Sequence, residues 1–192
     1  MTAAQGRRVA VVGDAMLDVY LRGDVDRISP EAPVPVVRVK ERKLALGGAA
    51  NVANNIVTIG ARCELVSAVG DDPAGATLRD MLQKVKTDTR ALVSVRRTTT
   101  TKTRVVARSQ QMVRYDEEDD SDLAGEEISR LLEALESAIG DADALVLEDY
   151  NKGVLIPEVI SRGIAWAKAR GIPVIVDPKY RNFFSYRGAT IF

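Results

Sequence analysis

The segment with the clearest chemical potential is Gly47-Gly48-Ala49-Ala50-Asn51, which opens a helical pattern that reaches Gly60. Two adjacent glycines allow the backbone to approach a bound group closely. The first amides of a helix lack partners within the helix and can bind such a group, and Asn51 adds a donor and an acceptor. The alternative is a tight turn into a core helix. We expect Gly47, Gly48 and Asn51 to contact a ligand.

Two pairs of carboxylates follow directly on apolar runs of strand length. They are Asp14 and Asp18 after Val9–Val12, and Glu148 and Asp149 after Ala144–Leu147. The ends of parallel strands are where α/β sheets bind ligands, and carboxylates there can accept hydrogen bonds from the donor groups of a ligand. Asp14 has the alternative role of capping the turn after its strand. We expect these carboxylates to contact a bound ligand.

Two lysines stand in the loops that follow predicted strands. Lys152 lies in Tyr150-Asn151-Lys152-Gly153, and Lys179 ends Asp177-Pro178-Lys179. A fixed positive charge at a strand end can stabilise the oxygens of a transferred phosphoryl group. The alternative is an ordinary strand-to-helix loop with a surface lysine.

A third group of candidates is basic. If Lys102–Arg108 is extended, its period of two places Lys102, Arg104 and Arg108 on one face of a strand. Planar guanidinium groups suit phosphate oxygens. An exposed edge strand protected by charge is the alternative, which the sequence favours equally.

Composition excludes several classes of function. Lysine plus arginine equals aspartate plus glutamate, at 27 each, so no overall charge attracts nucleic acid or an anionic membrane. Aromatic residues make up only 5%, and none interleaves with the charges of Lys102–Arg108, so the stacking platforms of single-strand binders are missing. The glycine-rich motifs of P-loop NTPases and of Rossmann dinucleotide-binding proteins are also missing from the sequence.

The acid–base groups are limited to carboxylates and lysines. The sequence has no histidine, which excludes Ser-His and Cys-His mechanisms, and its one cysteine, Cys63, lies in an apolar run that predicts a buried structural thiol. A metal site would be lined by oxygen, and no metal ligands are assigned. No apolar run approaches the roughly 18 residues of a membrane span, and Met1–Arg8 lacks the apolar core of a signal peptide. We therefore expect a cytoplasmic protein.

The elements that would position these residues follow an alternating pattern. With 192 residues and 46% hydrophobic content, the chain can bury a sizeable core. Strand-length apolar runs alternate with amphipathic helical runs, which predicts a mostly parallel sheet with helices on both faces. The predicted strands are Val9–Val12, Glu64–Val69, Ala144–Leu147 and Ile172–Val176, and the predicted helices are Gly48–Ile59, Asp72–Val85, Glu126–Ile139 and Pro157–Arg170.

Two segments interrupt this alternation. Asp24–Lys40 contains three prolines and a β-rich tail, and Thr98–Tyr115 is polar, β-branched and without helical period. Both are expected to form antiparallel strands outside the main sheet. The acidic segment Asp116–Asp122 that follows is interpreted as a solvated loop.

The glycine-rich segment fits a longer pattern. The spacing from Gly47-Gly48-Ala49-Ala50-Asn51-Val52-Ala53 to Gly60 and Gly70 resembles the N-terminal signature of the ribokinase-like, phosphofructokinase-B type carbohydrate kinases. Further segments are similar to one branch of that family, the heptose 7-phosphate kinases. They are Gly13–Asp18, Arg27–Val37, Ser109–Gln111, Asp149–Gly153 and Asp177–Lys179. The resemblance extends from about Val9 to Phe192.

This resemblance implies a ribokinase-like α/β fold with a small inserted β-lid, formed by strands near 24–40 and 98–116. In the family such a lid covers the sugar and often pairs with a second subunit, so we expect a homodimer through the lid strands. The implied reaction is ATP-dependent phosphorylation of D-glycero-D-manno-heptose 7-phosphate at O1, with Mg²⁺. The product, the 1,7-bisphosphate, is an intermediate in activating heptose for the lipopolysaccharide core.

The resemblance also suggests roles for the candidate residues. Asp18 falls where the family has its sugar-binding aspartate. Lys102, Arg104 and Arg108 would then bind the phosphate of the sugar, whereas Lys152 and Lys179 would stabilise phosphoryl oxygens during transfer.

One part of the family pattern has no counterpart. Family members continue well beyond this length, and their second signature, a Gly-Ala-Gly-Asp loop with the catalytic aspartate and the oxyanion hole, does not occur in the sequence. We therefore expect residues 1–192 to be the N-terminal portion of one kinase domain, with the base beyond Phe192. The alternatives are a kinase of another sugar in the same family and a non-catalytic, dimerised sugar-phosphate-binding module.

Overall fold

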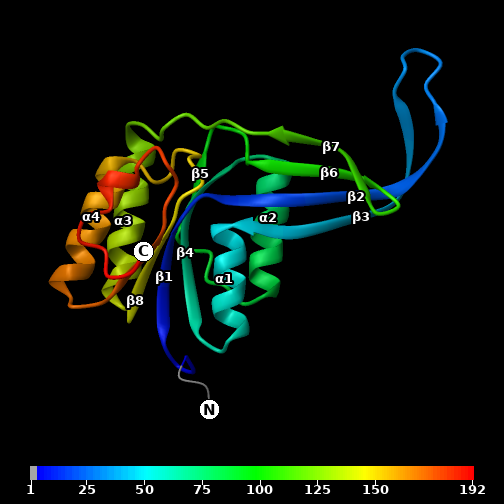
Figure 1. Ribbon diagram of the computed structural model, residues 1–192. Coiled ribbons are helices and arrows are strands. Elements are labelled where there is room, and N and C mark those ends of the chain that lie inside the picture. Colours follow the sequence, from blue (N-terminus) through cyan, green and yellow to red (C-terminus); the bar gives the residue numbers. More distant parts are fainter. Residues whose placement is uncertain (1–3) are drawn as a thin grey trace.

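A computed structural model describes residues 4–192 and shows a layered α/β body from which a second sheet extends (Figure 1). Residues 1–3, the start of the Met1–Arg8 segment considered above, lie outside the described residues. The five-stranded main sheet is parallel throughout, in the order β5-β4-β1-β8-β9. Its strands are β1 (Arg8–Gly13), β4 (Arg62–Gly70), β5 (Leu92–Val95), β8 (Ala144–Glu148) and β9 (Val174–Asp177).

Helices cover both faces of this sheet, as the sequence predicts (Figure 1). One face is covered by α1 (Ala49–Thr58) and α2 (Pro73–Lys84), and the other by α3 (Glu126–Gly140) and α4 (Pro157–Ala169). The short 3-10 helix η1 (Phe183–Ser185) follows β9. The predicted helices agree with these bounds to within one or two residues at each end, whereas the edge strand β5 was not predicted.

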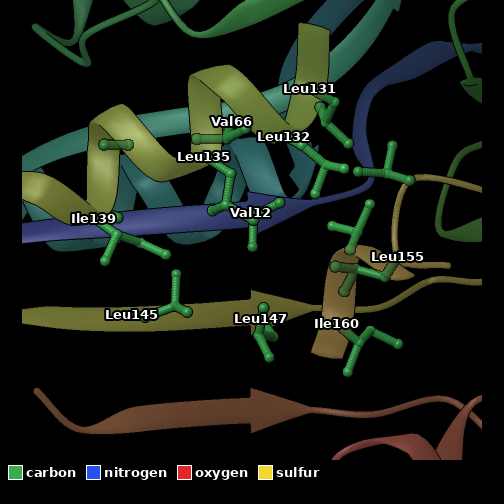
Figure 2. Packing of buried hydrophobic residues seen from close by; sticks show 14 of the residues in the cluster. Val12, Val66, Leu131, Leu132, Leu135, Ile139, Leu145, Leu147, Leu155 and Ile160 are labelled. Atoms are coloured by element: carbon green, nitrogen blue, oxygen red, sulfur yellow. The ribbon is translucent and has the colours of Figure 1, made fainter. Parts of the chain in front are cut away.

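The core has two parts because successive side chains of β1 point to opposite faces of the sheet. Val12 packs with Val66 and with Leu131 and Leu135 of α3, as Figure 2 shows. Val11 lies in the other part, with the buried alanines of α1 and with Leu78 and Leu82 of α2. The central strand is thereby held from both sides, which fixes the position of its carboxyl end.

Two local predictions are confirmed. The Asp72 side chain accepts a hydrogen bond from the Gly75 amide at 2.7 Å, and Pro73 occupies the first turn of α2, so this helix starts as expected. Cys63 is buried, and burial raises the pKa of its thiol to about 12. A thiol with so high a pKa is a poor nucleophile, in agreement with a structural role.

The second sheet, called the lid here, has the strand order β3-β2-β6-β7. Its strands are β2 (Ala15–Ile28), β3 (Pro35–Gly48), β6 (Thr101–Ala107) and β7 (Gln110–Glu117). The expected strands outside the main sheet are therefore present, with β2/β3 and β6/β7 antiparallel. Two details differ from expectation: β2 and β6 pair in parallel, and the β2–β3 ribbon spans residues 15–48 rather than 24–40.

The lid strands reach closer to the body than predicted, because their ends on that side are buried against it. Leu17 and Val19 are each 3% exposed, whereas Asp18 between them points to the other face of the lid. The chain passes from β1 into β2 through Asp14 alone, and from β3 into α1 at Gly48. Lid and body therefore share both the carboxylate segment and the glycine segment singled out in the sequence.

A matched pair of glycines tests the close approach at the start of α1. Gly48 and Gly125 both cap helices at nearly the same backbone angles, with φ of 52° and 56°. A Cβ on Gly48 would overlap the Asp14 carbonyl oxygen, whereas a Cβ on Gly125 would meet no atom within 4 Å. Gly125→Ala is expected to lower the free energy of unfolding by about 1 to 2 kcal/mol through backbone strain alone. Gly48→Ala should cost about 2 kcal/mol more, because the backbone must also move. Urea unfolding measures both values, and equal losses would contradict the close approach.

Candidate functional site

The candidate site lies where β1, β8 and β9 end and where the lid joins the body. The register pairs Gly13 with Glu148 and Glu148 with Asp177, so the polar residues after these strands share one edge of the sheet. The Asp14 amide donates to the Glu148 carbonyl oxygen at 3.2 Å. The sequence-predicted groups after β1, β8 and β9 therefore come together, as the parallel arrangement requires.

Asp14 faces inward and holds the loop that follows β8. Its carboxylate is 2% exposed and accepts amide hydrogen bonds from Tyr150 at 2.8 Å, Lys152 at 3.1 Å and Val154 at 3.2 Å. Burial raises the pKa of this carboxyl, while the three amide hydrogen bonds oppose the rise. The expectation that Asp14 contacts a ligand is therefore not supported, because both carboxylate oxygens already accept bonds in a buried place.

Asp149 has a similar inward role, contrary to the prediction that it binds the ligand. It is 1% exposed, and its oxygens accept the Asn151 amide at 2.8 Å and the buried Tyr186 hydroxyl at 2.7 Å. The loop needs this support because Asn151 has a left-handed φ of 55° and Gly153 one of 79°. The two buried aspartates together fix the backbone from which Lys152 projects.

The Lys152 side chain reaches the lid. Its Nζ lies 2.7 Å from Glu118 Oε1, and Glu118 Oε2 lies 3.2 Å from Nζ of Lys102 on β6. Lys102 also contacts Asp116 at 3.1 Å, and Asp116 accepts two hydrogen bonds from Arg114. A continuous set of charge pairs thus connects the loop after β8 with two lid strands.

Asp18 lies on the same face of the lid as Lys102, its neighbour in the β2–β6 register. Its Oδ1 accepts a hydrogen bond from Arg104 at 2.6 Å. A Cβ on Gly47 would lie 2.7 Å from the other oxygen, Oδ2, so the glycine leaves space beside this carboxylate. Asp18 is therefore oriented through one oxygen. Residue 47 does not block the other oxygen, because a glycine has no side chain.

The start of α1 borders this carboxylate. The Ala49 amide donates to the Asp14 carbonyl oxygen at 3.0 Å, which ties the helix start to the end of β1. Asn51, in the first turn, is exposed. Its side-chain amide is therefore accessible from solvent.

Glu148, Asp177 and Lys179 form the third part of the site. Burial, followed by the charge of Asp177, raises the pKa of the Glu148 carboxyl to about 7, and Lys179 partly offsets this rise. The Lys179 Nζ lies 4.7 Å from the centre of the Tyr150 ring. The Glu148 carboxyl therefore keeps its proton to a higher pH than a solvated glutamate does.

One sequence prediction about the lid is wrong. Arg108 does not share a strand face with Lys102 and Arg104, because β6 ends at Ala107 and Arg108 adopts a left-handed φ of 55° in the turn to β7. Its amide bonds the Gly23 carbonyl oxygen, well along β2 from Asp18. The acidic segment is exposed, as expected, but Asp116 and Glu118 within it also pair with lysines. The signal that could have revealed this was the opposite charge of the neighbouring basic strand.

The described part of the chain, residues 4–192, contains no group of three or more side chains arranged to bind a metal ion. It also contains no helix long and apolar enough to cross a membrane.

The chain is similar to a known protein family and to proteins within it. The pattern of the pfkB family of carbohydrate kinases matches residues 7–187. The chain is 48% identical over 185 residues to the bifunctional protein HldE of Rhodospirillum rubrum, an alignment that covers 96% of this chain and 37% of that protein. It is 48% identical over 190 residues to the protein of the same name from Caulobacter vibrioides, covering 98% and 39%. The chain thus spans under two fifths of the length of these relatives.

Solved structures share the fold. Escherichia coli phosphofructokinase-2, in a tetrameric inhibited form, gives a TM-score of 0.72 at 20% identity, over 95% of this chain and 58% of that one. Arabidopsis thaliana ribokinase, complexed with ribose and ATP, gives 0.65 at 15% identity, over 93% and 55%. The architecture is therefore a ribokinase-like α/β fold, as the sequence resemblance implies.

The inward role of Asp14 can be tested with Asp14→Asn. The asparagine presents an NH₂ group to backbone amides that need an acceptor, so we expect a loss of about 2 to 4 kcal/mol in the free energy of unfolding. The amides of Tyr150, Lys152 and Val154 should exchange with deuterium much faster. The control is Asp143→Asn, because Asp143 also accepts an amide, that of Arg8, but is exposed. A similar small loss in both variants would contradict the proposed support of the loop.

The raised pKa of Glu148 predicts a pH-dependent stability. Between about pH 5 and 8 the folded protein retains the Glu148 proton more tightly than the unfolded chain does, so this residue lowers the free energy of unfolding as the pH rises, by about 2 to 3 kcal/mol. Glu148→Gln should remove this part of the pH profile, whereas Glu133→Gln, on an exposed part of α3, should leave it unchanged. Urea unfolding at several pH values provides the comparison, and parallel profiles for wild type and Glu148→Gln would refute the prediction.

Proposed function

The chain belongs to the pfkB family of carbohydrate kinases, and on this premise we propose that it binds D-glycero-D-manno-heptose 7-phosphate for ATP-dependent phosphorylation at O1. The product would be the 1,7-bisphosphate used to activate heptose for the lipopolysaccharide core. The observation that supports this best is the convergence of Asp18 with Lys102, Arg104 and Lys152 on one face between lid and body. A carboxylate suits sugar hydroxyls, and the cations suit a phosphate.

The sugar would lie between the lid and the start of α1. Asp18 would accept hydrogen bonds from hydroxyl groups through the oxygen beside Gly47, while Arg104 holds the other oxygen. Asn51 would donate to and accept from the same ligand. Lys102 and Lys152 would bind phosphate oxygens, with Lys152 oriented by the loop that Asp14 supports.

ATP and Mg²⁺ are the cofactors that this family membership implies. Lys179 would supply a cation for a phosphate, and Glu148 and Asp177 would supply carboxylate oxygens of the type that Mg²⁺ prefers. Bound Mg-ATP would supply the phosphoryl group and shield its charge. In this proposal the residues described here bind and orient the substrates, and none of them is assigned as the base for the sugar hydroxyl.

The lid also suits a second copy of the chain. β3 and β7 are the edges of the lid sheet, and Val39, Val113 and Tyr115 are each about half exposed there. Exposed apolar side chains at a sheet edge favour pairing with another sheet. We therefore propose a homodimer through the lid, in a cytoplasmic enzyme whose partners are sugar phosphate and ATP rather than nucleic acid or membrane.

Two alternative functions predict different binding and turnover from the one proposed. A kinase of another sugar in the family would use the same face with different hydroxyl contacts, and the Arg27–Val37 and Gln110–Gln111 segments favour the heptose branch over it. A non-catalytic module would bind the sugar phosphate without turnover. Titration calorimetry with heptose 7-phosphate and with other sugar phosphates, combined with an assay of ADP release, separates these functions.

Asn51→Ala provides the mutational test. We expect heptose 7-phosphate to bind about tenfold more weakly, because a buried ligand hydroxyl loses its partner. Nucleotide binding should change little. Asn55→Ala is the matched control, since Asn55 is an exposed asparagine one turn further along the same helix. Equal weakening by both variants, or tight binding of heptose 7-phosphate by Asn51→Ala, would contradict the proposed sugar site.

A further inference from the structure

Two lysines from distant parts of the chain meet at a single carboxylate. Lys102 belongs to the lid strand β6 and Lys152 to the loop after β8. Their Nζ atoms lie 3.2 Å and 2.7 Å from the two oxygens of Glu118, one lysine at each oxygen. Two ammonium groups arranged around one anion in this way form a site for an oxyanion with several acceptor oxygens.

The lysines are poorly hydrated, which makes an anion between them necessary. The side chains of Lys102 and Lys152 are only 10% and 16% exposed. Two like charges brought this close out of water repel each other strongly unless a negative group lies between them. Burial raises the pKa of the Glu118 carboxyl, but the hydrogen bonds from Lys152 and Lys102 outweigh it, and the net pKa is lowered. Glu118 is therefore the ionised counter-charge.

The surrounding charges leave room for more negative charge than Glu118 supplies. Three basic side chains, Lys102, Arg114 and Lys152, meet two carboxylates, Asp116 and Glu118, in this connected group, so one positive charge is in excess. The neighbouring Arg104–Asp18 pair adds no net charge. A phosphate monoester bears a charge of roughly −1.5 to −2 at neutral pH. A phosphate that replaces the Glu118 carboxylate therefore brings the net charge of the group close to zero.

The backbone around residue 118 allows the Glu118 side chain to move away from the two lysines. β7 ends at Glu117, so residue 118 makes no ladder hydrogen bond with β6. The chain is next held at the Ser121 carbonyl oxygen by Arg97 and at Leu123, which is buried and whose amide bonds Gly153. The side chain can swing outward while both anchors remain in place.

We propose that the space between Lys102 and Lys152 is a phosphate-binding subsite, which Glu118 occupies until a phosphate oxyanion displaces it. The inference builds on the proposed function, because that function requires two phosphate-bearing substrates. The phosphate could belong to the sugar or to the nucleotide. Displacement would release the link between the end of β7 and the loop after β8, so lid and body would then be joined through the ligand.

The test compares Glu118→Gln with Glu117→Gln in the 192-residue chain. Both variants remove one negative charge from adjacent positions, but among the described residues only Glu118 of the two forms ion pairs with Lys102 and Lys152. Inorganic phosphate is the first probe, titrated by calorimetry at fixed ionic strength. Glu118→Gln removes the competing carboxylate and should bind phosphate at least about tenfold more tightly than wild type, while Glu117→Gln should bind it as wild type does.

Unchanged or weaker phosphate binding in Glu118→Gln would overturn the proposal, and so would the same gain in Glu117→Gln. Circular dichroism shows whether each variant is folded, and Glu118→Asp, which retains the charge but is too short to reach both lysines, provides a second folded variant with the same expected direction. Lys102→Met in the Glu118→Gln background should abolish the gain, and a gain that persists would count against the subsite.

The source of the phosphate is decided by two further titrations. A gain with heptose 7-phosphate but not with the unphosphorylated heptose assigns the subsite to the sugar, whereas a gain with ATP alone assigns it to the nucleotide. A gain with inorganic phosphate together with no binding of any heptose would support the subsite and refute the proposed substrate. The two hypotheses therefore fail separately.

Discussion

The carboxylate of Asp14 is the interaction on which the rest of the site depends. It lies at the end of the central strand β1 and accepts three amides of the loop after β8, while its own carbonyl oxygen accepts the first amide of α1. A buried carboxylate is costly unless its oxygens are bonded, and loop amides in unusual backbone conformations are costly unless they have an acceptor. The Asp14 carboxylate and the loop amides therefore satisfy each other's hydrogen-bonding requirements. The same residue thereby positions the lysine loop and the glycine-rich helix start.

The lid adds charges that the body alone does not provide. Asp18 and Arg104 pair on one lid face, and Lys102 lies beside them. On the body side the only lysine that reaches this group among residues 4–192 is Lys152, through Glu118. The groups proposed to bind the ligand are thus divided between two sheets that share β1–β2 and β3–α1 as connections. A ligand bound by both would hold the two sheets together, which is the arrangement expected of a kinase that must exclude water from a transferred phosphoryl group.

Sequence patterns worked where the deciding contacts are local or periodic. The apolar strands, the amphipathic helices and the Asp72-Pro73 helix start depend on residues within a few positions of one another, and all are found as predicted. Gly48 has a positive φ and lies against the Asp14 carbonyl oxygen, so a contact within the chain requires this glycine, while its predicted contact with a ligand stays a prediction. The predictions failed where a side chain's role depends on a distant partner. Asp14 was predicted to contact a ligand because its amide partners lie 136 to 140 residues away, and Asp149 because the Tyr186 hydroxyl that donates to it lies 37 residues away.

The sequence by itself determined the fold class, the family and the residue types available for chemistry, because these depend on composition, periodicity and short motifs. Only the tertiary structure decided which carboxylates face inward, that Arg108 leaves the basic strand and that Glu118 lies between two lysines. The physical reason is that a carboxylate's role is set by its exposure and by the charges and amides around it, and these come from segments that the fold alone brings together.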